Sequence, residues 1–215
     1  MIGFYDYTVI LTYISLFSSV VGMTMALQNK MLTAIFCLMF SGLCDMFDGK
    51  VASTKKNRSE DHKNFGIQID SLCDVICFGV FPAIIGYVSG LKTTWGICCI
   101  AVYILAGVIR LAFYNVYAEK HNRVKKANII YLRGLPITSA AFIFPALILL
   151  KNVLHFTPTQ FYVVFMVVMY TTALLFLVDI RIPKPNNVGK LIMVILGFAL
   201  FFLCFITING YYKIV

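Results

Sequence analysis

Long apolar runs alternate with short polar breaks along the whole chain. Each run is about as long as the 20 residues that an α-helix needs to cross the hydrocarbon core of a bilayer. The pattern predicts seven helices, near residues 7–28, 31–50, 66–90, 93–117, 135–152, 157–179 and 189–209. The expected fold class is therefore all-α, a polytopic transmembrane helix bundle of about seven helices. We expect one membrane domain over residues 1–215, because no room is left for a separate soluble domain.

Composition strengthens this interpretation. Apolar residues make up 60% of the chain and charged residues 13%, and the mean hydropathy is +0.88. These values lie far outside those of an ordinary soluble domain. The seven cysteines are an odd number and sit mostly in apolar runs, so we interpret them as small hydrophobic residues, without the second Cys or His pair that a zinc site needs.

The basic residues are distributed unequally between alternate loops. Thirteen of the eighteen Lys and Arg residues fall in the loops near residues 50–63, 120–133 and 181–190, whereas Lys30, Lys92, Lys151 and Lys213 fall on the opposite side. The positive-inside rule therefore predicts that the three basic loops and the N-terminus lie at the cytoplasmic face of the cell membrane.

Membrane orientation is a sufficient explanation for most of these basic residues. A basic rim also attracts anionic lipids and anionic nucleotide-bearing substrates. The loops lack interleaved aromatic residues, which argues against a nucleic-acid partner. We find no internal repeat, and this argues against an inverted-repeat transporter.

Four of the nine acidic residues lie on two neighbouring predicted helices, two on each. Asp45 and Asp48 are three residues apart, and Gly49 and Ala52 continue the same helical face. After a polar linker, a second stripe consists of three residues spaced four apart: Gly66, Asp70 and Asp74.

Two helices that face each other with these stripes would gather four carboxylates around one cavity, with small residues leaving room for a ligand. Like charges so close together need a compensating cation, and ionisable groups at membrane depth face a partner or a cavity. We therefore expect one or two hard divalent ions, held by carboxylate oxygens and by a phosphate-bearing substrate.

The two stripes together resemble the signature of the CDP-alcohol phosphotransferases, which are integral membrane enzymes of phospholipid synthesis. Seven of the eight fixed positions of that signature are present in order. In the family pattern an Arg follows the Ala directly, and eight residues separate this Arg from the next Gly. Here Ser53 takes the place of that Arg, and twelve residues separate it from Gly66. The nearby Lys55, Lys56 and Arg58 are candidates for the missing positive charge.

Further stretches are similar to the phosphatidylserine synthases within this family. They begin at Asp70, Arg110, Arg133 and Asp179, and the second of them has Phe113 where the subgroup usually has another Arg. The resemblance implies transfer of a phosphatidyl group from CDP-diacylglycerol to L-serine, which releases CMP. It also implies contact with membrane lipids and a homodimer.

The resemblance also implies roles for individual residues. Two divalent cations, Mg²⁺ or Mn²⁺, would be bridged by Asp45 and Asp70, with Asp48 completing one site and Asp74 the other. Asp74 would also act as general base on the serine hydroxyl. The cytidine diphosphate pocket would be lined by Gly49, Ala52 and Gly66, with Thr12 at its edge and position 53 near the phosphates.

Because serine carries a carboxylate, its site requires a cationic side chain. Arg110 is the first candidate, since an Arg within an apolar helix is costly without an anionic partner. Arg133 and Arg181 follow, at loop edges on the same side, and anchoring at the interface is the alternative for all three.

Two other functions fit the same residues. One is the same chemistry with another acceptor, such as glycerol 3-phosphate, inositol or inositol phosphate. The other is a divalent-cation channel or transporter, in which the acidic cluster is a permeation site near the middle of the membrane.

Overall fold

The structure is a computed structural model that describes residues 3, 7–55, 59–123, 131–183 and 187–212. Within these residues the helices are α1 (Ile10–Leu27), α2 (Met31–Thr54), α3 (Glu60–Asp74), α4 (Phe81–Val88), α5 (Thr94–Arg123), α6 (Ala140–Val153), α7 (Pro158–Leu177) and α8 (Asn187–Tyr212). Short 3-10 turns, η1 (Tyr7–Val9) and η3 (Ile137–Ser139), precede α1 and α6. A π-helical segment, η2 (Val75–Val80), joins α3 to α4.

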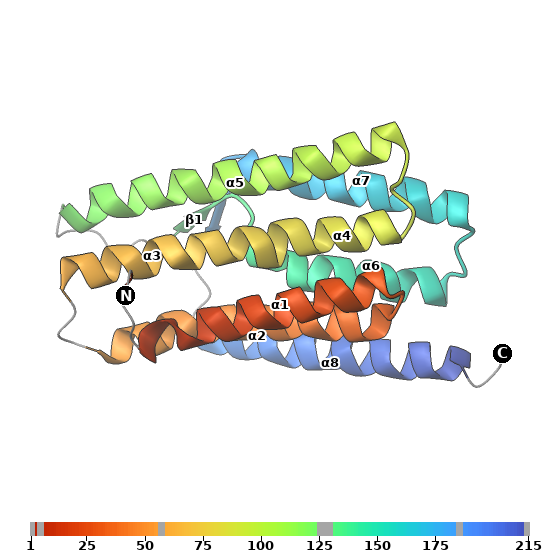
Figure 1. Cartoon of the computed structure of the whole chain (residues 1–215), viewed down its shortest axis with the longest axis horizontal. Helices are drawn as coiled ribbons and strands as arrows, with labels where there is room; N and C mark the ends of the chain where they lie inside the picture. Colours follow the sequence, from red (N-terminus) through yellow and green to blue (C-terminus); the bar gives the residue numbers. More distant parts are fainter. Residues whose placement is uncertain (1–2, 4–6, 56–58, 124–130, 184–186, 213–215) are drawn as a thin grey trace.

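The helices form a bundle along one common axis (Figure 1). Because η2 joins α3 and α4 into one span over Glu60–Val88, the eight helices make seven rods. Five spans are long and apolar enough to cross a membrane, and Ile137–Val153 and Val194–Thr207 are shorter apolar stretches. The predicted all-α polytopic membrane bundle is confirmed.

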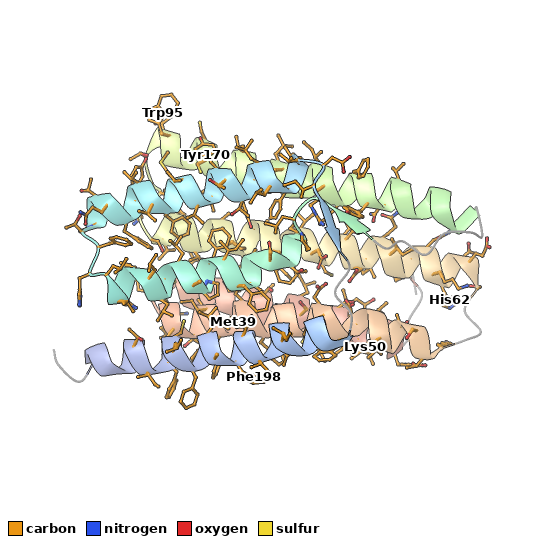
Figure 2. All side chains as sticks on the ribbon, turned by 180° about the vertical axis from the view of Figure 1, so that it is seen from behind. Met39, Lys50, His62, Trp95, Tyr170 and Phe198 are labelled. Atoms are coloured by element: carbon orange, nitrogen blue, oxygen red, sulfur yellow. The ribbon has the colours of Figure 1, made fainter. Side chains whose placement is uncertain are left out.

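The outer surface of the bundle is apolar, as expected of a surface in contact with lipid. Trp95 and Phe198 point away from it on opposite sides (Figure 2), and their side chains are 74% and 60% exposed. The interior holds an aromatic cluster in which Phe144 contacts both Tyr103 and Phe165 at ring-centroid distances of 5.6 Å.

The connections divide between the two ends of the bundle as the basic-loop pattern predicts. Short turns join α1 to α2, α4 to α5 and α6 to α7 at one end (Figure 1). The chain between α2 and α3, and the segments that carry β1 (Tyr131–Arg133) and β2 (Arg181–Pro183), lie at the other. The antiparallel pairing of β1 with β2 was not predicted, because strands of three residues leave no periodic pattern.

Gly134 holds this ribbon against the end of α7. Its amide donates to the Ile180 carbonyl at 2.8 Å, and its φ of +71° is one that other residues rarely adopt. A Cβ atom there would lie 3.0 Å from the Phe176 carbonyl oxygen.

The predicted start of the third helix, at residue 66, was wrong by six residues, because α3 begins at Glu60. Ser59 caps this helix by accepting a hydrogen bond from the His62 amide at 3.3 Å, and Glu60 and Asp61 follow in the first turn. Since α2 continues to Thr54, only residues 55–59 separate the two helices.

Small and hydroxyl residues let α1 approach α2 and the π-helical segment closely. A Cβ atom on Gly22 would lie 2.3 Å from the Phe81 ring, so only glycine fits there without a shift. The Ser15 hydroxyl donates to the Ser41 carbonyl at 3.2 Å and also lies 3.6 Å from the Cys77 sulfur in η2. Such contacts are typical of helix packing within a membrane.

The π-helical segment begins directly after Asp74. It is anchored by Tyr103 of α5, whose fully buried hydroxyl donates to the Phe78 carbonyl at 2.7 Å. Single π-helical turns interrupt the regular α-helical hydrogen bonding and are frequent at functional sites. Tyr103 is therefore positioned to stabilise the turn that follows Asp74.

Replacing Tyr103 with Phe should destabilise this segment, because the Phe78 carbonyl loses a buried donor. We expect the free energy of unfolding to fall by about 1–3 kcal/mol. Amide hydrogen exchange over residues 75–81 should rise together with a fall in melting temperature in detergent. Tyr13→Phe, on the exposed face of α1, is the matched control, and equal exchange in both variants would contradict the role of Tyr103.

Candidate active site

Three carboxylates from two helices converge inside the bundle, between its middle and the end that carries the basic loops. Asp45 of α2 and Asp70 and Asp74 of α3 are half-buried, and one oxygen of each lies within 4.8 Å of the others. Asp48 extends the cluster, because its carboxyl group contacts that of Asp70. The two predicted stripes therefore face each other.

The cluster has the composition of a site for hard divalent cations. All its ligand atoms are carboxylate oxygens, which suit Mg²⁺ or Mn²⁺ better than softer metals. Asp70 Oδ1 is buried and has no hydrogen-bond partner among the described residues. A buried carboxylate oxygen without a partner is costly unless a cation or a proton satisfies it, so the residues fit a divalent ion.

A pocket of about 350 Å³ opens beside the cluster. Four residues that the resemblance assigns to the cytidine diphosphate pocket line it: Thr12, Gly49, Ala52 and Gly66. Asp48 and Asp70 belong to the same wall, together with Thr8, whose buried hydroxyl has no partner among the described residues. A Cβ atom on Gly49 would meet nothing within 4 Å, so this glycine leaves open space in the pocket. We call this cavity the first pocket.

The predicted place of Ser53 near this pocket is not what the structure shows. Its side chain is exposed, it is absent from the pocket wall, and its hydroxyl donates to the Lys50 carbonyl at 2.6 Å within α2. Lys63 of α3 lines the pocket instead. Sequence reasoning missed Lys63, although it lies seven residues before Asp70 and thus on the same helical face.

Arg110 of α5 lies on the other side of the cluster. It is only 8% exposed, it interacts electrostatically with Asp74, and its guanidinium lies 4.7 Å from the centre of the Tyr114 ring. Its Nε has no hydrogen-bond partner among the described residues. It lines a second pocket of about 270 Å³, formed by α5 and the end of α7, whose wall includes Phe113 and Asp179.

The two other predicted arginines cannot be placed at the site. Arg133 and Arg181 face each other in the register of β1 and β2, but their side chains lie outside the described residues. Lys56 and Arg58 also lie outside the described residues.

A polar contact between α3 and α5 fixes the distance between the cluster and Arg110. The Ser71 hydroxyl donates to the Asn115 side-chain carbonyl at 2.8 Å, and the Asn115 amide donates to Gln68 at 3.2 Å. Asn115 lies in the stretch that begins at Arg110. The structure gives it a packing role, one and a half turns from Arg110 on the same helix.

Proteins from several organisms that are named CDP-diacylglycerol–serine O-phosphatidyltransferase are similar to this chain. The protein from Helicobacter pylori (strain 26695) is 29% identical over 189 residues, which cover 86% of this chain and 76% of that protein. The protein from Methanocaldococcus jannaschii is 25% identical over 210 residues, covering 94% and 91% of the two chains. The protein from Saccharomyces cerevisiae is 37% identical over 100 residues, covering 45% and 34%.

The model of the CDP-alcohol phosphatidyltransferase family matches residues 8–156. The matched region contains both carboxylate stripes, the first pocket and Arg110. The chain therefore belongs to the CDP-alcohol phosphatidyltransferase family.

Proposed function

We propose that the protein transfers the phosphatidyl group of CDP-diacylglycerol to L-serine, with release of CMP. The observation that carries this proposal is a carboxylate cluster that lines one pocket, beside Gly49, and interacts electrostatically with Arg110, which lines a second pocket. The names of the similar proteins support the same substrates.

The first pocket would hold the cytidine diphosphate part of the donor. Gly49, Ala52 and Gly66 leave room in its wall, and Thr12 contributes a hydroxyl at its edge. Asp45, Asp48, Asp70 and Asp74 would bind two divalent cations. When bound, such ions neutralise phosphate oxygens and stabilise both the attacking and the leaving oxygen.

The transfer requires a base, because a serine hydroxyl is a weak nucleophile. We propose that Asp74 takes the hydroxyl proton while the serine oxygen forms a bond to the phosphorus of the phosphatidyl group. The bond from that phosphorus to the CMP oxygen then breaks, and CMP leaves with the electron pair. Asp74 is suited to this task because it lies at the side of the cluster nearest Arg110 and the second pocket.

The second pocket would hold the serine. Arg110 offers a buried, charged donor for the serine carboxylate, and Asp179 on the same wall can attract the ammonium group. The pocket volume of about 270 Å³ fits a small amino acid. Inositol and glycerol 3-phosphate stay as alternative acceptors, and a turnover assay distinguishes them from serine.

The bilayer accounts for the all-helical architecture. The acyl chains of the donor would stay in lipid while the headgroup reaches the cluster from the end of the bundle that carries the basic loops. The excess of Lys and Arg in the loops of this end supports a cytoplasmic orientation of the site. A cation channel is less well supported, because the cluster lies beside a pocket and the family is a transferase family.

The proposal is tested by a turnover assay on the purified full chain in detergent. CDP-diacylglycerol is supplied with Mg²⁺ or Mn²⁺ and with a panel of labelled acceptors: L-serine, glycerol 3-phosphate, inositol and inositol phosphate. We expect CMP release and a labelled lipid with L-serine, and loss of both when the metal is chelated. If only another acceptor gives a labelled lipid, that acceptor replaces serine in the proposal. If no acceptor on the panel supports CMP release, the transferase proposal is refuted.

Replacing Asp74 with Asn should abolish transfer while the fold and donor binding largely persist. Loss of a general base lowers turnover by about 10²–10⁴-fold, and loss of a metal ligand adds to this. The measurements are CMP release, the melting temperature and retention on an immobilised CDP matrix. Turnover near the wild-type level would remove Asp74 as the base.

Replacing Arg110 with Gln should weaken serine binding selectively. We expect at least a tenfold rise of KM for serine and an unchanged KM for CDP-diacylglycerol, since the two substrates occupy different pockets. The preference for serine over ethanolamine, which lacks the carboxylate, should therefore become smaller, measured as the ratio of their kcat/KM values. Lys92→Gln, at the other end of the bundle, is the control, and equal effects on serine and ethanolamine would contradict a carboxylate contact.

A further inference from the structure

Lys63 is the one cationic side chain in the wall of the first pocket among the described residues. We propose that Lys63 binds the diphosphate group of the CDP-linked donor, the function that the sequence pattern would assign to residue 53. This inference rests on the proposed function, because it names a contact for the same donor.

The start of α3 places Lys63 on the face that carries the carboxylates. Lys63, Ile67, Asp70 and Asp74 follow at intervals of four, three and four residues, which is one stripe of an α-helix. The first three of them line the same pocket. A diphosphate bound beside Asp70 is therefore within the region that Lys63 borders.

This turn of α3 exists because the chain between the stripes is longer than the family pattern. Twelve residues, in place of eight, separate Ser53 from Gly66, and the four additional residues correspond to about one helical turn. The first turn of α3, Glu60–Lys63, lies within this longer segment. The Ser59 cap and the bond from the Lys63 amide to the Ser59 carbonyl, at 3.2 Å, fix this turn.

Charge also favours a ligand role for Lys63. Cations near a helix N-terminus oppose the helix dipole, so this lysine does not contribute to the stability of α3. The pocket is also lined by Asp48 and by Thr8, whose hydroxyl has no partner among the described residues. A diphosphate that bridges the carboxylate-bound cations and Lys63 would be neutralised on both sides, and Thr8 would offer it a further donor.

The neighbouring described residues are less suited to this contact. The amines of Lys50 and Lys55 lie 5.4 Å and 6.0 Å from the centres of the Phe47 and Tyr7 rings, and neither residue lines the pocket. The Ser53 hydroxyl is directed to its own helix. Lys63 makes no ion pair or hydrogen bond through its side chain within the described part of the chain, and its amine is therefore available to a ligand.

The test compares Lys63→Gln and Lys63→Arg with the wild-type full chain, and uses Lys50→Gln as the matched lysine control. Binding of CDP and of cytidine to the purified protein is measured by calorimetry with Mg²⁺ present. Steady-state KM values for CDP-diacylglycerol and serine are measured in parallel.

We expect Lys63→Gln to weaken CDP binding and to raise KM for CDP-diacylglycerol by about tenfold, and to leave cytidine binding and KM for serine unchanged. Lys63→Arg should retain most of the affinity, and Lys50→Gln should behave as wild type. Equal CDP affinity in wild type and Lys63→Gln would overturn the assignment of Lys63 alone. Failure of the wild type to bind CDP would instead refute the proposed donor, so the two failures are distinguishable.

Discussion

The structure depends on keeping four carboxyl groups together inside a membrane bundle. Asp45, Asp70 and Asp74 have oxygens within 4.8 Å of one another, and Asp48 contacts Asp70. Charges of one sign at this spacing repel strongly where the dielectric constant is low. The arrangement is stable only if cations or protons compensate it, and packing must hold the two helices in place when the compensation changes.

That packing comes from contacts that α2 and α3 make with α1, with the π-helical segment and with α5. Ser15 and Ser41 link α1 to α2, and Ser15 also contacts Cys77 in the π-helical segment. On the other side Asn115 links α5 to Ser71 of α3. Polar groups buried in a membrane protein are costly unless they are paired, so these contacts resist sliding of the helices and preserve the spacing of the carboxylates.

The sequence was sufficient for the parts of the molecule that follow a period. The seven rods and the two facing stripes were predicted, because apolar length and a repeat of three or four residues are local properties. The start of α3 was missed because its first turn, Glu60–Lys63, is polar and was assigned to the linker, although Ser59 followed by Glu60 and Asp61 is a start signal for a helix.

Other features depend on contacts between distant segments. The π-helical segment is bonded to Tyr103, which lies 25 residues after Phe78. The direction of the Ser53 side chain also depends on such contacts. Consecutive side chains on a helix point about 100° apart, so Ala52 and Ser53 cannot both face the pocket. The packing of α2 decides which of these two residues does.

The two pockets suggest why a third helix, α5, lies beside the carboxylate cluster of α2 and α3. In the proposed transfer the attacking and leaving groups are on opposite sides of the phosphorus, so donor and acceptor would approach the carboxylates from different directions. α2 and the start of α3 border the first pocket, whereas α5 and the end of α7 border the second. Asp74 is the member of the cluster that interacts electrostatically with Arg110. A carboxylate there can serve both the ions and the acceptor, which a residue on the donor wall, such as Asp48, is less well placed to do.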